Sequence, residues 1–430
     1  MAKRRVVITG LGVISPCGAG WQPYWEALVH GRSHIRTIQS MSLNGFPSKF
    51  AGEIPDFDPR GYVKQRKSLK VMSREIQLAV AASQLAVEDA GLVISEEDKD
   101  HIGICLGTGI INNDLDEVGI GIRNGMDDEG KFDMAKFGQA GIRSLYPLWF
   151  LKYLPNMPAC HISIAHGLRG PSNTITTSSA SAAQAIGDAY RTLERGDADV
   201  MIAGGTDSKI NAYGMGRFEM LGLLSRRNHT PQDAYCPFDQ KHDGIIVGEG
   251  AGLIILEERE RALRRGAQIY AELIGYGVSS DFNPDPRQTT DTMGKCIAMK
   301  TALKDAGIHN RDVSFVVANG SGIPCQDIQE AIALREVFEH AENGLRVTAL
   351  KPITGHLVYA SGGVEMTGTV MALREGIIPP LINLKNPHPE CSLPFVTDEF
   401  QPCDGDIALF NSFGFGAQNV SLVMRRGEFS

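Results

Sequence analysis

The sequence has little charge for its length and no excess of basic residues. Asp, Glu, Lys and Arg make up 21% of 430 residues, and the 42 Lys and Arg are outnumbered by 50 Asp and Glu. Binding a phosphate backbone requires a surplus of positive side chains, so a nucleic acid is not an expected partner. The 48 glycines instead favour closely packed layers joined by tight turns.

Long hydrophobic runs and paired cysteines are also missing. No run of about 18 uncharged apolar residues occurs, so a membrane span is not expected. Lys3, Arg4 and Arg5 lead directly into an apolar strand, without the hydrophobic region of a signal peptide. None of the eight cysteines forms a C-x-x-C pair, which favours reduced thiols over a disulfide framework or a zinc site. These absences predict a cytoplasmic protein without a metal site.

The chain is organised around residues 174–205, which read as a short strand, an abrupt turn at Ser178-Ser179, a helix and a second buried strand. Apolar residues at helical spacing indicate the helix. Its start places Ser179 near unpaired backbone N–H groups and the positive end of the helix dipole, where a developing anion is favoured. The residues at this spacing are Ala180, Ala183, Ile186, Ala189, Tyr190 and Leu193.

Three further stretches combine glycine with polar or charged residues. They are Asn319 to Pro324 (NGSGIP), Lys351 to His356 (KPITGH) with Glu365 downstream, and Asn411 to Asn419 (NSFGFGAQN). Together with the turn at Ser179, these stretches resemble the active-site motifs of the β-ketoacyl synthases, the condensing enzymes of fatty-acid and polyketide synthesis. The resemblance extends over essentially the whole chain. It implies an α/β protein with the duplicated thiolase fold, a five-layer αβαβα arrangement.

An internal repeat agrees with a duplicated fold. Residues 315–323 (FVVANGSGI) echo residues 102–110 (IGICLGTGI) at an offset of 213 residues, and residues 359–361 echo residues 179–181 at an offset of 180. The difference indicates about 33 extra residues between strand and turn in the first half. We therefore expect halves at 1–255 and 256–430, with an irregular insertion at about 111–170 that covers a pocket or contacts another subunit.

The resemblance assigns the catalytic nucleophile to position 179, where the family has cysteine and this chain has serine. A cysteine at a helix N-terminus can be a thiolate at neutral pH, whereas a serine hydroxyl stays protonated and needs a positioned base. Ser179 is therefore expected to be a poor acyl acceptor. An interpretation at least as good is that Ser179 is a small polar residue that caps the helix.

Only one of the two catalytic histidines of the family is retained. Asn319 stands at the first position, where its amide can donate a hydrogen bond but cannot shuttle a proton; a structural Asn in a glycine turn is the alternative. His356 matches the second histidine. Lys351 and Glu365 match the lysine and glutamate that accompany it, and a buried ion pair is expected of them.

The resemblance also predicts the surroundings of the site. Phe415 would be a gate beside the pocket and Ile110 would line it, although Ala417 and Gln418 depart from the family pattern at the gate. A basic cluster either docks an acidic acyl carrier protein or is only a solvated face. The substrate would be held on the phosphopantetheine of that carrier, and no other cofactor is implied. The cluster consists of Lys64, Arg66, Lys67, Lys70 and Arg74.

Loss of the cysteine together with one histidine predicts loss of condensation chemistry, because removing a nucleophile lowers the rate by several powers of ten. We expect a non-condensing partner subunit, similar to the chain length factors of type II polyketide and polyene systems. It would form a heterodimer with an active, cysteine-bearing synthase. The alternative is a serine-type decarboxylase that converts malonyl-carrier protein to acetyl-carrier protein.

Overall fold

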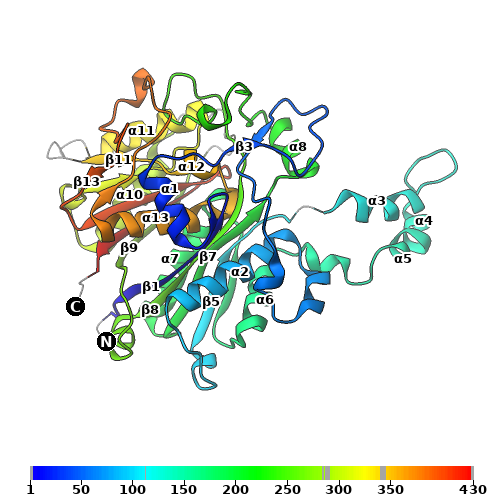
Figure 1. Cartoon of the computed structure of the whole chain (residues 1–430), viewed down its shortest axis with the longest axis horizontal. Helices are drawn as coiled ribbons and strands as arrows, with labels where there is room; N and C mark the ends of the chain where they lie inside the picture. Colours follow the sequence, from blue (N-terminus) through cyan, green and yellow to red (C-terminus); the bar gives the residue numbers. More distant parts are fainter. Residues whose placement is uncertain (1–2, 112, 283–284, 286–290, 339–344, 428–430) are drawn as a thin grey trace.

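The computed structural model describes residues 3–111, 113–282, 285, 291–338 and 345–427. Within these ranges the chain builds one 11-stranded sheet. Ten of its strands follow in the order β11-β10-β14-β15-β9-β1-β8-β7-β5-β6, and β2 (Gly18–Ala19) pairs with β1. Figure 1 shows helices against both faces of this sheet and the two ends of the chain close to each other.

The first half of the sheet consists of β1, β8, β7, β5 and β6. β5 lies parallel to β6 and β7, whereas β7 with β8 and β8 with β1 are antiparallel pairs. β1, β5 and β7 are buried along their whole length, which is typical of strands covered on both faces. The bounds are β1 (Val6–Ser15), β5 (Ile102–Gly107), β6 (Ser172–Ile175), β7 (Val200–Ser208) and β8 (Glu249–Glu258).

The second half repeats this arrangement with β9, β15, β14, β10 and β11. β10 lies parallel to β11 and β14, whereas β14 with β15 and β15 with β9 are antiparallel pairs. The strand order and the pairings are those of the first half, so the fold is duplicated. The bounds are β9 (Ala271–Ser280), β10 (Phe315–Val317), β11 (Arg346–Thr348), β14 (Ile407–Phe413) and β15 (Gln418–Arg426).

The two halves join where β1 pairs with β9. The expected boundary between residues 255 and 256 lies inside β8, and the repeat of strand order instead divides the chain between β8 and β9. β8 ends where the carboxylate of Glu258 accepts hydrogen bonds from the N–H groups of Glu260 and Arg261 and so begins α9 (Arg259–Arg264).

Two helices form the middle layer. α7 (Ser181–Arg195) and α13 (Ser361–Glu375) each contact strands of both halves. α2 (Arg74–Asp89) and α6 (Met157–His166) cover the outer face of the first half, and α10 (Met293–Ala306) and α11 (Pro324–Phe338) cover that of the second. The order of helix, sheet, helix, sheet and helix is the five-layer αβαβα arrangement that the sequence predicts.

An arm, residues 113–156, leaves the body between β5 and α6 and extends far to the right in Figure 1. It contains α3 (Leu115–Asn124), α4 (Met134–Lys136) and α5 (Ile142–Ser144), all of which contact a short π-helical segment, Phe137–Gly141. The sequence predicts an irregular segment at about 111–170 that covers a pocket or contacts another subunit. The structure shows short helices in an arm that extends away from the body and a regular helix, α6, in the outer layer, so the segment is not irregular. Contact with another subunit stays a prediction.

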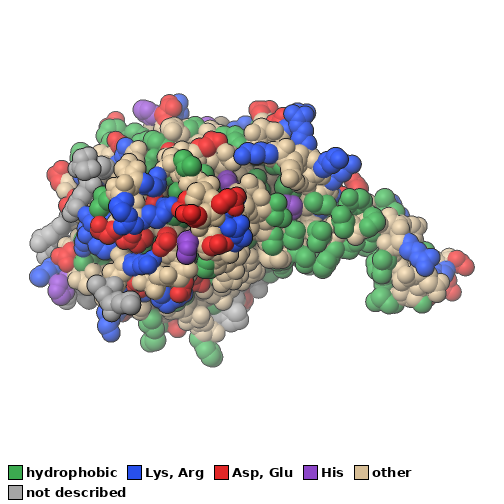
Figure 2. All heavy atoms as spheres, turned by 90° about the horizontal axis from the view of Figure 1, so that it is seen from below, with side chains coloured by type: hydrophobic (Ala, Val, Ile, Leu, Met, Phe, Trp, Pro, Cys, Tyr) green, Lys and Arg blue, Asp and Glu red, His purple; other side chains and the backbone are tan. Residues whose placement is uncertain are grey.

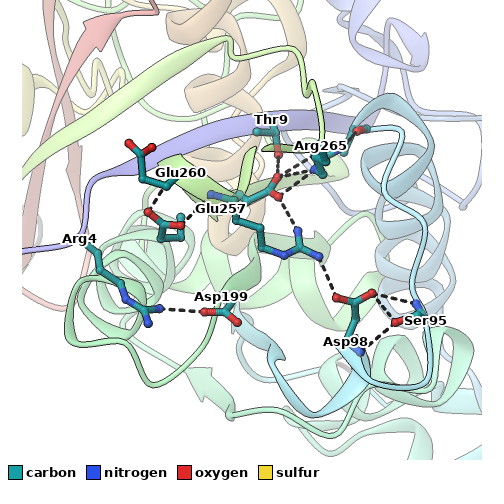
Figure 3. Close-up of polar contacts among 11 residues, drawn as sticks. Arg4, Thr9, Ser95, Asp98, Asp199, Glu257, Glu260 and Arg265 are labelled. Carbon is teal, nitrogen blue, oxygen red and sulfur yellow. Dashed lines mark hydrogen bonds and ion pairs between the residues drawn. The ribbon is translucent and has the colours of Figure 1, made fainter. Parts of the chain in front are cut away.

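The end of the sheet remote from the turn at Ser179 is held by a buried carboxylate. Glu257 is fully buried at the end of β8 and accepts hydrogen bonds from Thr9 Oγ1 at 3.0 Å and from Arg265 Nη2 at 2.7 Å. Arg261 also pairs with Glu257 and reaches Asp98 at 3.1 Å; Figure 3 shows Glu257 with Thr9, Arg265 and Asp98 around it. These contacts tie β1, β8 and α9 together, so the buried charge is fully partnered.

The remaining elements are short. None of the helices in the described ranges has both the length and the apolar character that crossing a bilayer requires. The remaining helices are α1 (Trp21–Val29), α8 (Ala212–Met220) and α12 (Lys351–Thr354), and the remaining strands are β3 (Arg36–Thr37), β4 (Phe50–Ala51), β12 (Ile377–Ile378) and β13 (Gln401–Pro402).

Candidate functional site

The turn that carries Ser179 has a strained backbone. Ser178 has a φ of 57°, a left-handed conformation that costs a non-glycine residue about 1–3 kcal/mol. The chain then makes one 3₁₀ turn (Ser178–Ala180) and continues as α7. Ser179 is thereby placed between β6 and α7, with only 1% of its surface exposed. The strand, abrupt turn and helix follow one another as the sequence predicts.

The Ser179 hydroxyl donates to the main-chain oxygen of Phe413 at 3.4 Å. Ser181 is the first residue of α7 and holds the turn before it. Its hydroxyl accepts a hydrogen bond from the N–H of Thr177 at 2.7 Å and donates one to the main-chain oxygen of Ser178 at 2.7 Å. The capping interpretation of Ser179 is therefore wrong, because the helix begins two residues later. Among the described residues, no histidine, lysine or carboxylate hydrogen-bonds to the Ser179 hydroxyl, so in this structure no base is positioned on it.

Asn319 lies in the loop after β10 and is held by charged groups. Lys351 Nζ donates to the main-chain oxygen of Asn319 at 2.5 Å and to its side-chain oxygen at 3.1 Å. Lys351 also forms a buried ion pair with Glu365 at 3.0 Å. Glu330 accepts from the N–H of Asn319 at 2.7 Å, and burial raises the pKa of Glu330 to about 7. Because the amide oxygen faces Lys351, the amide N–H groups are what Asn319 can offer to a carbonyl.

His356 is fully buried, and only one of its ring nitrogens is engaged. Nδ1 accepts from the N–H of Val358 at 3.0 Å, so the proton of the neutral ring lies on Nε2. Burial, and then the nearby Lys351 ammonium, lower the pKa of His356 well below 6.5, so the ring is neutral at pH 7. Within the described part of the chain, Nε2 has no hydrogen-bond partner. This N–H is therefore available to polarise a carbonyl oxygen.

Phe415 stands between His356 and a cavity of about 260 Å³. Its ring centroid lies 5.0 Å from that of His356 and 6.0 Å from that of Phe218 on α8. Ser178 and Phe415 line the cavity, whereas Ser179 and His356 are not among the described residues that do so. The gate role of Phe415 stays a prediction, since gating requires this ring to move.

Ile110 is not part of the lining of this cavity. Its side chain is 48% exposed, and its main-chain oxygen accepts from Lys209 Nζ at 2.9 Å. Lys209 belongs to a buried charge cluster that sequence reasoning missed: it pairs with Asp207 and lies 3.9 Å from Glu75. Burial raises the pKa of Glu75 to about 7, although Lys209 opposes the shift. The available signal was a lysine and an aspartate at the end of an otherwise apolar strand.

The basic cluster divides into two groups. Arg74 is committed to the body, since it pairs with Glu249 at 2.9 Å, donates to the oxygen of Ile54 at 2.6 Å and stacks over Phe57 at 5.1 Å. The other members lie before and within the 3₁₀ segment that precedes α2, and their side chains face solvent. The exposed members are Lys64, Arg66, Lys67 and Lys70.

Comparison with known proteins agrees with this geometry. Residues 3–262 match the family model described as β-ketoacyl synthase, N-terminal domain, and residues 270–385 match that of the C-terminal domain. The chain belongs to the β-ketoacyl synthase family and has its thiolase-type fold. It is a protein of the ketosynthase family, whose members act in fatty-acid or polyketide synthesis.

Individual relatives resemble the chain over nearly its whole length. The 3-oxoacyl-[acyl-carrier-protein] synthase 2 of Synechocystis sp. is 38% identical over 426 residues, 99% of each chain. The ishigamide ketosynthase/chain length factor has a TM-score of 0.86 at 30% identity, covering 99% of this chain and 100% of that one. A type II polyketide synthase acyl-carrier protein in complex with its ketosynthase has a chain with a TM-score of 0.86 at 28% identity, with the same coverage.

Proposed function

We propose that this chain is a non-condensing ketosynthase subunit, a chain length factor, that assembles with an active cysteine-bearing β-ketoacyl synthase. The observation that carries the proposal is the hydrogen bond of Ser179, whose hydroxyl donates to a peptide carbonyl instead of to a base. An alcohol without a base is a weak nucleophile at neutral pH. Asn319 adds a second loss, because an amide in place of an imidazole cannot transfer a proton.

The arm supports assembly with a second subunit. Figure 2 shows hydrophobic side chains gathered where the arm meets the body. A monomeric protein rarely exposes a continuous apolar patch of this kind, and such patches mark interaction surfaces. The exposed large hydrophobic residues of the arm are Leu115, Ile120, Ile122, Met126, Phe132, Met134, Ile142, Tyr146, Leu148 and Phe150. One of the similar structures is itself a ketosynthase/chain length factor.

Purification with a synthase tests this assembly. Co-expression with a cysteine-bearing ketosynthase of the same biosynthetic system is expected to give a 1:1 complex by mass photometry. Replacing Phe150, which is 55% exposed, by Asp should weaken that complex, because the charge would enter an apolar contact. The matched control is Val93→Asp, since Val93 is 84% exposed and lies outside the arm. Recovery of the wild-type chain only as a homodimer would contradict the heterodimer.

The free Nε2–H of His356 supports a second candidate, a malonyl decarboxylase. That N–H and the Asn319 amide are donors that can stabilise the enolate left when the bond between the carboxylate and the methylene carbon breaks. Carbon dioxide leaves, the bonding pair passes into the enolate, and a proton from water gives the acetyl thioester. This reaction requires no nucleophile at position 179.

Incubation with malonyl-carrier protein separates the two candidates. The purified chain is expected to release acetyl-carrier protein no faster than its His356→Ala variant, as measured by intact-protein mass spectrometry. Turnover that is abolished in His356→Ala and retained in Ser179→Ala would establish the decarboxylase instead. Formation of a β-ketoacyl product by the chain alone would overturn both candidates.

We further propose that the exposed basic residues before α2 bind an acidic carrier protein. Reversing the charge of Lys64, Arg66 and Lys67 should weaken carrier binding about tenfold and reduce its salt dependence, because exposed charges act through screened Coulomb attraction. The control is Lys131→Glu, since Lys131 is exposed in the arm, between α3 and α4. Equal affinity of the triple variant and the wild type in calorimetry would place the docking surface elsewhere.

A further inference from the structure

The cavity beside Phe415 has lining residues that the site described above does not use. Its walls are mostly apolar and include Phe218, Leu221 and Leu223, and Arg217, Lys209 and Tyr359 line it as well. At about 260 Å³, it is smaller than the roughly 300–1,000 Å³ of most small-molecule sites. Bulky side chains in its wall therefore limit the size of a ligand that fits.

Tyr359 fills space that the backbone has left open for it. A Cβ atom on Gly109 would lie 1.8 Å from Cζ of Tyr359 and 2.2 Å from each neighbouring ring carbon. The phenol end of the ring thus occupies the volume of the missing side chain at position 109. Gly109 follows β5 and Tyr359 precedes α13, so the ring bridges elements from the two halves of the chain.

Buried charges hold the ring from the other side. Lys209 Nζ lies 5.3 Å from the ring centroid of Tyr359, a cation–π distance, while it donates to the oxygen of Ile110 at 2.9 Å. Asp207 pairs with Lys209 and accepts from the N–H of Tyr359 at 3.4 Å. The ring is therefore clamped between a glycine and an ammonium group, and Lys209 lines the cavity beside it.

We propose that Tyr359 is the residue that sets the length of acyl chain this cavity accepts. Its ring, which Gly109 and Lys209 hold in place, takes up space in the wall of the cavity that further methylene groups of a hydrocarbon chain would otherwise occupy. The proposal rests on the proposed function in one respect, namely that the ligand is an acyl thioester. It goes beyond that function by assigning the length limit to one side chain of this subunit.

The test is a series of S-acyl pantetheines of about six to about fourteen carbons, titrated calorimetrically into the full-length chain as purified, alone or in complex with its synthase. Each methylene that enters apolar space should tighten binding about fourfold, and the gain should stop at a limiting length. Tyr359→Ala is expected to move that limit to longer chains. Tyr359→Phe, which keeps the ring, should leave the limit where it is.

A matched control and a second variant keep the proposal open to refutation. Tyr213→Ala removes a tyrosine that is exposed on α8 and does not line the cavity, so the limit should not change. If Tyr359→Ala fails to fold by circular dichroism, Tyr359→Leu takes its place, with the same expected direction. A folded variant with the wild-type limit, or binding of no acyl chain by any variant, would overturn the assignment.

The two proposals fail separately. If Tyr359→Ala does not change the limiting acyl-chain length but the chain still forms a 1:1 complex with its synthase, the role of Tyr359 is contradicted and the partner-subunit function is not. A shifted limit in a chain that condenses acyl units by itself would keep Tyr359 as the determinant of length and remove the partner-subunit function.

Discussion

Ser178 and Val358 lie 180 residues apart and have the same backbone. Each has a left-handed φ, 57° at Ser178 and 47° at Val358. Each begins a single 3₁₀ turn that continues into a 15-residue helix, α7 or α13. Gly196 and Gly376, with φ of 83° and 65°, end those helices. We call residues 178–181 and 358–361, where each 3₁₀ turn leads into its helix, the first and second elbow. The duplication has preserved both elbows, and the strained first residue is not glycine in either copy.

The residue after the strained position differs between the two elbows. In the first it is Ser179, whose hydroxyl has only a long bond to a peptide carbonyl. In the second it is Tyr359, whose ring is clamped between Gly109 and the Lys209 ammonium. The scaffold thus fixes where the side chain stands, and the neighbours decide what it can do. The predictions below alter one elbow at a time, in order of decreasing expected effect.

Restoring the chemistry of the first elbow should produce the largest change. Ser179→Cys combined with Asn319→His should load acetyl groups from acetyl-carrier protein about 10²–10⁴-fold faster than either single variant, because a thiolate gains an imidazole partner. Intact-protein mass spectrometry measures the loading. Ser178→Cys with Asn319→His is the control, since it moves the thiol by one residue. A double variant as silent as the wild type would show that more than these two groups has been lost.

Breaking the ion pair that holds Asn319 should destabilise the whole fold. Lys351→Met leaves Glu365, which is 3% exposed, without a counter-charge, and the expected loss of unfolding free energy is about 3–5 kcal/mol. Urea denaturation measures it. Lys300→Met removes a lysine from a solvent-exposed pair with Glu336 and should cost less than about 1 kcal/mol. Equal losses in the two variants would contradict the structural role of the buried pair.

The charges behind the second elbow make stability depend on pH. Because burial raises the pKa of Glu75 from 4.5 to about 7, the folded state binds more protons than the unfolded state between these values. Stability is therefore lost as pH rises through that window, by up to about 3 kcal/mol. Glu75→Gln should reduce the slope of unfolding free energy between pH 4.5 and 7 and leave the part due to Glu330, whose pKa burial also raises to about 7, whereas exposed Glu129→Gln should leave the slope unchanged. An unchanged slope in Glu75→Gln would show that another group titrates there.

Crowding the second elbow tests the contact between Gly109 and Tyr359. Gly109→Ala should cost about 1–3 kcal/mol of stability, because its Cβ would overlap the ring. In a Tyr359→Ala background the same change should cost almost nothing, a coupling that a double-mutant cycle reports. Gly119→Ala in α3 is the control, since its Cβ would meet no atom within 4 Å. If the losses of unfolding free energy for Gly109→Ala and Tyr359→Ala are additive, the Tyr359 ring does not contact Gly109.

Removing the hydroxyl of the first elbow should have the smallest effect. Ser179→Ala gives up one hydrogen bond of 3.4 Å, so the change in unfolding free energy should be below about 1 kcal/mol. The complex of the Ser179→Ala variant with an active synthase should form product at a rate within about a factor of two of the wild-type complex, because less than about 1 kcal/mol is lost. A tenfold fall in output, measured by chromatography of the products, would mean that this serine takes part in chemistry.

The fold was largely readable from the sequence because motifs and repeat agree. Apolar runs mark β5 and β7, and the offset of 180 residues locates both elbows. The arm was not readable, because its helices are short and its apolar residues face outward, so no periodicity points to a core. α6 was missed for a different reason: it is covered by both α2 and β5, and a helix buried on more than one side shows no amphipathic pattern.

The site was readable only where neighbours in sequence are neighbours in space. The motif residues lie on the elements expected of them, although the start of α7 fell two residues from its expected place and changed the interpretation of Ser179. The clamp around Tyr359 was not readable, because Glu75, Gly109 and Lys209 come from three distant segments. Only the tertiary fold brings them together.

The arm has a consequence for production in the cell. A newly made chain exposes the hydrophobic surface of the arm from the moment the ribosome releases it. Exposed hydrophobic surfaces of this kind cause identical chains to aggregate at high expression. Yield should therefore rise when the gene is translated alongside that of its synthase, since an early encounter shields this surface before copies of the same chain collide.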